Sequence, residues 1–330
     1  MKINIFFPFF QGPYGGGNQF LKALRDYFIE KNVYAENMED ADVILFNSHH
    51  EIKKLIKIKQ KYPKKTFVHR IDGPVYLTRK DNIYLDKLIY KLNDKIADAS
   101  IFQSNWSKKK NYEFGIKSKK FETTILNAPN PEIFNNKNKI KFSKHRKTKI
   151  IATSWTTNMS KGFKTYKYLD ENLDFSKYEM TFCGNSPVKF KNIKHIKPLP
   201  SRELAGQLKQ HDIYITASKN DACSNSLIEA LHCRLPAIGL NDGGNPEIIG
   251  KAGLVFNKKE EIIGYFEEII ENYDTFQKNI NLPTMENVGE KYYNFMASVF
   301  EKNIQKKQVN IFTFISIYKS IYLQKIIKHF

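Results

Sequence analysis

The chain has 330 residues, 41% of them hydrophobic and 26% charged, which is the balance of a globular protein too long for one core. Its 53 Lys and Arg against 34 Asp and Glu give a net charge of +19 and indicate an anionic partner. Zinc-finger, recognition-helix and RNP patterns are absent, which argues against nucleic acid. Three cysteines without C-x-x-C spacing, and with no signal peptide before them, predict reduced thiols in a cytoplasmic protein.

Residues 2–9 form a β-type run, and a turn through the glycines at 15–17 follows it. After the turn, apolar residues recur at helical spacing from Phe20 to Phe28, which predicts an amphipathic helix. Glycines at a strand-to-helix turn let backbone N–H groups approach a ligand closely. The G-x-G-x-x-G spacing is absent, so this loop does not indicate a dinucleotide site.

Two further runs, residues 41–47 and 66–74, are apolar and end in polar residues, as strands do at the functional rim of a parallel sheet. His69, Arg70 and Asp72 gather at the end of the second run. They can contact a substrate, or His69 can cap the strand while Arg70 pairs with Asp72.

Residues 136–148 are rich in like charges and have almost no apolar periodicity, which predicts a linker. Strand and helix patterns alternate on either side of it. Such alternation predicts an α/β protein with two Rossmann-like, doubly wound domains that face each other across a cleft. The predicted ranges are 1–135 and 149–283 for the two domains and 284–330 for C-terminal helices.

A strand and a polar turn open the second domain. Lys149 to Thr153 reads as the strand, and a turn rich in Ser, Thr and Asn leads through Lys161 and Gly162 into a helix from Phe163 to Leu169. A lysine at such a turn can neutralise a ligand phosphate, or it can be one more surface lysine in a lysine-rich chain.

Residues 219–247 place two carboxylates eight positions apart. Asp221 follows the β-type run Asp212 to Ala217, and Glu229 lies on a predicted helix that Ser224 to Ser226 can cap. The start of a helix offers unpaired N–H groups to an anion, and the carboxylates on either side can accept hydrogen bonds from hydroxyls. A ligand with both phosphate and hydroxyl groups, a nucleotide sugar, fits this arrangement; the alternative is a turn-capping Asp221 and a solvated Glu229.

Asp221-x7-Glu229, with Gly243, Gly244 and Glu247 after it, resembles the E-x7-E segment of glycosyltransferase family 4. Those enzymes have the GT-B fold, use nucleotide-sugar donors and retain the anomeric configuration. The resemblance implies that Glu229 binds the ribose and that Asp221 lies against the donor sugar. Asp at 221 replaces the more common Glu, so its carboxylate is withdrawn by about one C–C bond.

The same resemblance extends to the strand and turn before Gly162, where it implies that Lys161 neutralises the donor diphosphate. Many members have an arginine about five residues earlier, where this chain has Thr156. Asn158, or a basic residue from the other domain, can compensate for that missing cation. The glycine turn is expected over the diphosphate and next to the acceptor, and the His69 loop is expected at the reacting sugar.

The implied site falls into three groups of residues. The catalytic group is His69, Asp221 and Lys161; the donor-binding group is Gly16, Gly17, Asn158, Lys161, Ser224, Asn225, Ser226, Leu227 and Glu229; the acceptor-side group is Asn18, Arg70 and Asp72. Asp40-Ala41-Asp42 is a D-x-D, the metal-holding sequence of the other large glycosyltransferase fold. It opens an apolar strand here, so we expect no essential metal and no cofactor.

The expected function is sugar transfer from a nucleotide diphosphate to a hydroxyl of a saccharide or lipid-linked acceptor, in the synthesis of a cell-surface polysaccharide or glycolipid. The alternative is a non-catalytic protein that binds sugar nucleotides or polyanions with the same fold. Residues 284–300 resemble the helix with which these enzymes return to the first domain. Residues 309–330 are apolar, aromatic and lysine-bearing, so they can lie in an anionic membrane interface, on the inner face of the membrane, or pack on the protein itself.

Overall fold

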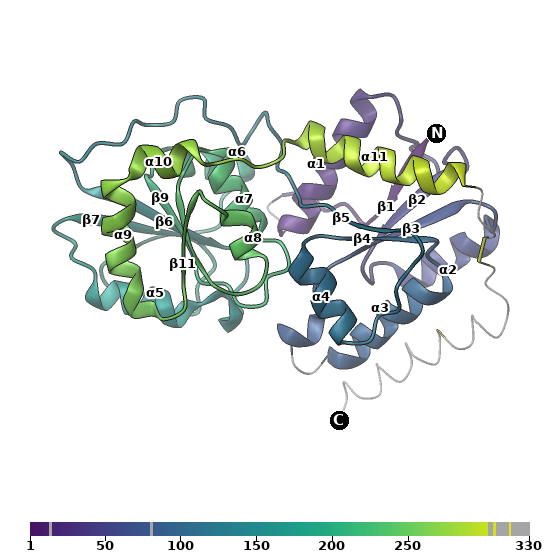
Figure 1. The fold of residues 1–330 in the computed structure, drawn as a ribbon, viewed down its shortest axis with the longest axis horizontal. Helices are drawn as coiled ribbons and strands as arrows, with labels where there is room; N and C mark the ends of the chain where they lie inside the picture. Colours follow the sequence, from purple (N-terminus) through teal and green to yellow (C-terminus); the bar gives the residue numbers. More distant parts are fainter. Residues whose placement is uncertain (13–14, 80–81, 303–305, 308–316, 318–330) are drawn as a thin grey trace. The chain divides into compact units, whose positions relative to one another are not determined.

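Two compact α/β units, each with one parallel sheet, make up the computed structural model (Figure 1). The structure describes residues 1–12, 15–79, 82–302, 306–307 and 317. Unit 1 comprises residues 1–9, 24–126 and those from Glu286 onward, and unit 2 comprises residues 10–23 and 127–285. The predicted domain ranges stay a prediction, and in the structure residues 127–148 group with unit 2.

Unit 1 is built on a five-stranded parallel sheet whose strands follow one another in chain order. Its strands are short. The first four are fully buried, because helices on a parallel sheet cover both of its faces, whereas the edge strand Glu122–Thr124 is half-buried. The strands are β1 (Ile3–Phe6), β2 (Val43–Asn47), β3 (Thr66–Ile71), β4 (Ala99–Phe102) and β5 (Glu122–Thr124).

Helices α2 and α3 of unit 1 are amphipathic and bury apolar side chains, whereas the buried residues of α4 are the polar Ser107 and Asn111. In Figure 1, α3 and α4 lie below the strands and α11 lies above them. The helices are α1 (Gly16–Glu30), whose first residues group with unit 2, α2 (Ile52–Lys61), α3 (Ile83–Lys95), α4 (Asn105–Glu113) and α11 (Met285–Glu301), with a short 3₁₀ turn η1 (Val75–Leu77).

Unit 2 contains a six-stranded parallel sheet in the order β11-β10-β9-β6-β7-β8. The chain begins at β6 in the middle, extends to β7 and β8 on one side, and then crosses to β9 on the other. Ligands of doubly wound sheets bind where the strand order reverses, at the carboxyl ends of the strands. The strands are β6 (Thr148–Ser154), β7 (Tyr178–Gly184), β8 (Lys194–Ile196), β9 (Ile213–Thr216), β10 (Ala237–Leu240) and β11 (Gly253–Phe256).

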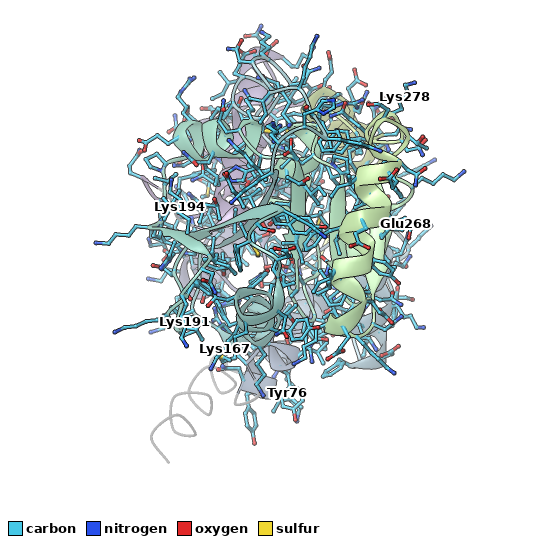
Figure 2. All side chains as sticks on the ribbon, turned by 90° about the vertical axis from the view of Figure 1, so that its left-hand side faces the viewer. Tyr76, Lys167, Lys191, Lys194, Glu268 and Lys278 are labelled. Carbon is cyan, nitrogen blue, oxygen red and sulfur yellow. The ribbon has the colours of Figure 1, made fainter. Side chains whose placement is uncertain are left out.

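A large apolar cluster lies in the core of unit 2, and charged side chains lie on the surface of this unit. Figure 2 shows Lys167, Lys191 and Lys194 extending from this surface, and all three residues are exposed. The helices are α5 (Phe163–Asn172), α6 (Ser201–Lys209), α7 (Asn225–His232), α8 (Asn245–Ile249), α9 (Ile262–Glu271) and α10 (Tyr273–Lys278), with the 3₁₀ turns η3 (Met159–Lys161) and η4 (Lys259–Glu261).

The segment predicted as a linker, residues 136–148, is held to unit 2 by charged side chains. Arg146 donates to both carboxylate oxygens of Asp212, at 2.7 and 2.8 Å, and the Lys139 ammonium group donates to the His211 carbonyl at 2.6 Å. A charge-assisted, bidentate pair with a buried Asp212 orders a chain segment more firmly than a surface pair. These contacts explain why a stretch without apolar periodicity groups with the second sheet.

The C-terminal region contributes to unit 1. Helix α11 covers most of the range expected for a returning helix, and the Tyr292 hydroxyl on it accepts a hydrogen bond from Arg70 Nε at 3.2 Å. Of residues 309–330, Ile317 is the one that the structure describes, and it is fully buried in the core of unit 1. That burial favours packing on the protein for this part of the tail. Within the described part of the chain, no helix has both the length and the apolar character that crossing a bilayer requires.

Candidate active site

A cavity of about 300 Å³ opens in unit 2 where the strand order reverses. The carboxyl ends of β6 and β7, the loops after β9 and before α6, the first turns of α7 and the start of α1 form its wall. The lining residues are Gly15, Gly16, Gln19, Thr153, Ser154, Trp155, Lys161, Cys183, Gly184, Pro198, Leu199, Ser201, Leu204, Ser218, Asp221, Cys223, Ser224, Asn225, Ser226 and Glu229.

Lys161 and Asp221 meet in this cavity as an ion pair. The Lys161 Nζ atom lies 2.7 Å from Asp221 Oδ2, and the two side chains are 29% and 16% exposed. Lys161 ends η3, and Gly162 after it has φ +83° and lies so near Ala217 that a Cβ atom there would come within 2.3 Å of the Ala217 Cβ. Only a glycine fits that close approach in a left-handed conformation, so Gly162 brings Lys161 against the loop after β9.

The glycine pair after β10 supports the loop that carries Asp221. Gly243 has φ +67°, and a Cβ atom there would lie 2.4 Å from the Asp221 carbonyl oxygen. The Gly244 N–H group donates to that same carbonyl at 2.8 Å. The Gly-Gly sequence therefore fixes the backbone of Asp221 and leaves its carboxylate in the cavity.

Glu229 lies on α7 and lines the cavity although it is only 8% exposed. Burial raises the pKa of this carboxyl to about 8, because charge is poorly solvated there. A carboxyl group in this position can accept hydrogen bonds when ionised or donate one when protonated, and both modes suit the hydroxyls of a ribose.

The start of α7 offers its backbone N–H groups to the cavity. Ser224 is the N-cap residue, but its side chain makes no capping hydrogen bond and lies 3.3 Å from the Ser226 hydroxyl instead. Asn225 accepts from Asn127 Nδ2 at 3.0 Å, and a Cβ atom on Gly16 would collide with the Asn225 side chain at 2.5 Å. The glycine turn thus comes into contact with an uncapped helix start, a favourable place for phosphate.

Of the residues predicted for donor and acceptor binding within unit 2, four more line the cavity beside Lys161, Asp221 and Glu229: Gly16, Ser224, Asn225 and Ser226. Asn158 caps η3 by accepting from Ser160 N at 2.9 Å. Asn18 exchanges two hydrogen bonds with the Phe10 backbone, both at 3.1 Å. These two side chains hold loops in place, and Leu227 is fully buried. The lining does not include Gly17. The ligand roles assigned to these four residues stay predictions.

His69 and Arg70 lie within β3, whereas we expected them in a loop after the strand. Pairing with β4 continues through Ile71, which extends the strand past both residues. His69 is fully buried: its ring stacks on Phe46 with centroids 4.3 Å apart, and Nε2 lies 3.0 Å from the Ser48 carbonyl oxygen. Burial lowers the pKa of this imidazole to about 4, so it is neutral at pH 7.

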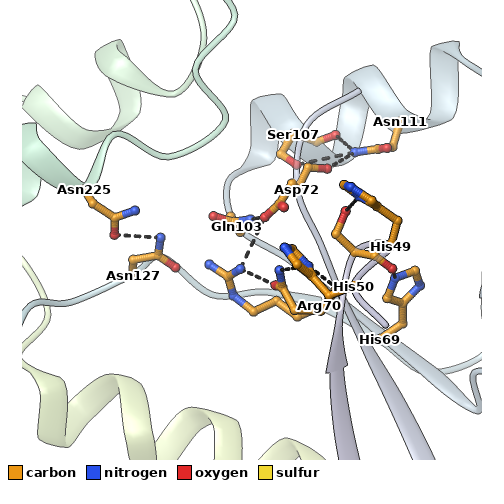
Figure 3. Close-up of polar contacts among 12 residues, drawn as sticks. His49, His50, His69, Arg70, Asp72, Gln103, Ser107, Asn111, Asn127 and Asn225 are labelled. Atoms are coloured by element: carbon orange, nitrogen blue, oxygen red, sulfur yellow. Dashed lines mark hydrogen bonds and ion pairs between the residues drawn. The ribbon is translucent and has the colours of Figure 1, made fainter. Parts of the chain in front are cut away.

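Arg70 and Asp72 form the polar network drawn in Figure 3. Arg70 Nη1 donates to Asn47 Oδ1 at 2.6 Å and lies 3.3 Å from Asp72 Oδ1, and Gln103 donates to the same carboxylate oxygen. Arg70 is fully buried, while Asp72 is partly exposed. The pairing of Arg70 with Asp72, which was the alternative to a substrate role, is therefore present. The predicted substrate roles of His69, Arg70 and Asp72 stay predictions.

Sequence analysis missed the wall that follows β7. Cys183, Gly184, Pro198 and Leu199 line the cavity, but they carry no motif of their own. The signal that could have found them is topological: carboxyl ends of parallel strands share one edge of the sheet. Trp155 stood beside the strand-end motif in the sequence and also lines the cavity. In the described part of the chain no group of three or more potential metal ligands occurs, and the absence of an essential metal stays a prediction.

Residues 157–283, which hold Lys161, Asp221 and Glu229, match the family model of the glycosyl transferases group 1. A comparison with curated protein sequences finds no match. Similar solved structures include HepE of Anabaena in complex with UDP, with a TM-score of 0.64, 12% identity, and 98% of each chain covered. The sucrose-phosphate synthase of Thermosynechococcus elongatus has a TM-score of 0.63 and 13% identity, with 87% of this chain and 79% of that chain covered. AviGT4, a glycosyltransferase involved in avilamycin A biosynthesis, has a TM-score of 0.63 and 9% identity, with 92% and 98% covered.

The fold of the chain is therefore that of the GT-B glycosyltransferases. The matched region and this fold together support a nucleotide-sugar glycosyltransferase.

Proposed function

We propose that the protein transfers a sugar from a nucleoside diphosphate sugar, with UDP as the favoured nucleotide, to a hydroxyl acceptor, and that the anomeric configuration is retained. The observation that carries this proposal is the cavity of unit 2, which brings Lys161, Asp221, Glu229 and the uncapped start of α7 together. UDP is favoured because the similar HepE structures hold UDP and UDP-glucose.

In the proposed complex each group contacts a different part of the donor. Glu229 holds the ribose hydroxyls, while Lys161 and the N–H groups at the start of α7 contact the diphosphate. When the bond between the sugar and the diphosphate breaks, negative charge grows on the leaving phosphate, and these donors stabilise it. Asp221 orients the donor sugar, and Asn18 serves the acceptor side.

The bond changes need no protein nucleophile. The acceptor oxygen attacks the anomeric carbon from the face that the diphosphate leaves, so one C–O bond forms as the other breaks. The acceptor proton passes to the departing phosphate oxygen. Retention follows, because the new bond occupies the side of the sugar that the old bond left.

The test is turnover of UDP-glucose and of other UDP-, GDP- and ADP-sugars, followed by release of the nucleotide with and without saccharide acceptors. Slow hydrolysis of one donor by the wild-type protein, abolished by Glu229→Ala, is expected. The anomeric configuration of the product is read by NMR. Absence of turnover with every donor, together with tight nucleotide binding, would refute the enzymatic proposal. Activity that persists in EDTA is expected, and a strict requirement for Mg²⁺ or Mn²⁺ would redirect attention to Asp40 and Asp42.

A non-catalytic nucleotide-sugar-binding protein is the second candidate. Two observations favour it: Thr156 stands where many relatives of the resembled family have an arginine, and Lys161 is already paired with Asp221. Binding of a nucleotide sugar without turnover of any donor and acceptor would select it.

We also propose a saccharide or lipid-linked acceptor in the synthesis of a cell-surface polysaccharide or glycolipid, with the protein in the cytoplasm and peripheral at the inner face of the membrane. The net charge of +19 supports contact with anionic lipid. The test is sedimentation of the full chain with anionic liposomes at low salt, compared with a variant that carries Gln at the three tail lysines Lys319, Lys325 and Lys328. If both chains sediment equally with the liposomes, the tail lysines do not contribute to membrane binding.

A further inference from the structure

Trp155 is an exposed indole in the wall of the cavity. It follows the last residue of β6 and is 42% exposed, although a tryptophan of a folded domain is usually well buried. Part of the Trp155 side chain is therefore accessible to a ligand in the cavity.

The position of this indole is determined on two sides. Its backbone carbonyl accepts a hydrogen bond from Asn185 Nδ2 at 2.6 Å, just after β7. On the other side, a Cβ atom added to Gly15 would lie 3.8 Å from Trp155 Cδ1, so the ring borders the glycine turn. Trp155 thus stands between the apolar wall after β7 and the polar wall at α7.

The charged side chains of the cavity attract a diphosphate only to a limited extent, so an uncharged contact adds to the binding of a donor. Three of its lining residues carry a carboxyl or an amino group in the side chain: Lys161, Asp221 and Glu229. Asp221 already neutralises Lys161, and burial keeps Glu229 from ionising readily. Attraction to a diphosphate by charge alone is therefore limited here. A flat aromatic surface binds rings by dispersion and stacking, which salt and neighbouring carboxylates hardly weaken.

We propose that Trp155 is a stacking platform for a ring of the nucleotide-sugar donor, either the nucleobase or the pyranose. The proposal rests on the proposed function, because it takes the donor to be the ligand of this cavity. Both rings offer the same chemistry, a face of low polarity that packs against the indole.

Fluorescence can observe the platform directly, because the chain has two tryptophans, Trp155 and Trp106 on α4. In Trp106→Phe the emission comes from Trp155 alone. Saturable quenching by UMP and UDP is expected for a stacked base. Quenching by UDP-glucose but not by UDP assigns the platform to the pyranose. The reciprocal variant Trp155→Phe, which keeps Trp106, should lose the response.

Affinity gives an independent measurement. Trp155→Ala should weaken binding of the quenching nucleotide by roughly 5- to 100-fold, the range of alanine substitutions at stacked bases. Trp155→Phe, which keeps a smaller ring, should lose only a few-fold. Far-UV circular dichroism and the melting temperature show whether each variant is folded.

The outcomes separate the two proposals. If a nucleotide saturates the wild-type protein in calorimetry, yet Trp155 emission is unchanged and Trp155→Ala binds equally well, the platform is refuted and the proposed function stands. If UMP, UDP and UDP-glucose all fail to bind or to raise the melting temperature of the wild-type protein, a UDP-sugar function fails and the platform for these rings fails with it.

Discussion

The ion pair between Lys161 and Asp221 makes a strong prediction about nucleotide affinity. In the free protein the Asp221 carboxylate occupies the ammonium group that the donor diphosphate needs, at 2.7 Å. Binding of the diphosphate must loosen that pair. Asp221→Asn keeps the shape of the side chain and removes its charge, so Lys161 becomes available and UDP should bind more tightly.

The size of the effect follows from the burial of the pair. Exposed ion pairs contribute about 0–1 kcal/mol, and charge-assisted hydrogen bonds in buried places about 1.5–3 kcal/mol. With side chains 29% and 16% exposed, this pair belongs between these classes. We therefore expect about 1–2 kcal/mol, which corresponds to roughly 5- to 30-fold tighter UDP binding.

Isothermal titration calorimetry with UDP is the assay, because UDP lacks the sugar that Asp221 is proposed to orient. A double-mutant cycle with Lys161→Ala isolates the coupling. In the Lys161→Ala background the gain from Asp221→Asn should fall to about 2-fold, the part that comes from direct repulsion between carboxylate and phosphate. Asp174→Asn, an exposed site that contacts Ser176, controls for the change in net charge.

Two results would refute the reasoning. Weaker UDP binding by Asp221→Asn would mean that the carboxylate supports the nucleotide rather than competing with it. An equal gain in both backgrounds would mean that Lys161 takes no part in binding the diphosphate.

Three further predictions concern charge and protonation. Lys161→Ala should lower turnover by roughly 100-fold or more, since it removes the cation at the leaving group, whereas the exposed Lys164→Ala should stay within about 2-fold in the same donor assay. The pKa of Glu229 is raised in the folded state. Between about pH 4.5 and pH 8, Glu229 is therefore protonated in the folded protein and ionised in the unfolded chain. Its contribution to stability therefore declines as pH rises through that window, and Glu229→Gln should gain on the order of 1–3 kcal/mol over the wild type in urea unfolding at pH 8.5 but little at pH 4.5. Desolvation of the imidazole ring lowers the pKa of three histidines to about 4, so the stability that they confer is complete above pH 6.5 and is lost as pH falls toward 4. A urea midpoint that does not fall between pH 7 and pH 4.5 would contradict this assignment. The three are His69, His211 and His232.

The sequence by itself determined the strands, the helices and the turns between them, because these depend on residues that are close together along the chain. Apolar runs of four to seven residues, separated by helical periodicity, predict parallel sheets covered by helices, and both sheets are present. Lys161 beside Gly162, and Asp221 eight positions before Glu229, stand at strand-to-helix turns. Local spacing is sufficient to place such residues at the rim of a sheet, because a strand followed by a helix must turn there.

Only the tertiary structure decided which distant residues meet. Lys161 and Asp221 are 60 positions apart and form an ion pair because β6 and β9 are adjacent in the sheet. The burial of His69 depends on Phe46 and Asn93 from other segments, and no periodicity around residue 69 could have predicted it. The exposure of the Trp155 indole likewise depends on how distant segments pack and cannot be predicted from the residues around it. The burial of a side chain, its ion pairs and the neutralisation of its charge depend on contacts between residues that are far apart in the chain. The local sequence pattern does not show which of these residues meet.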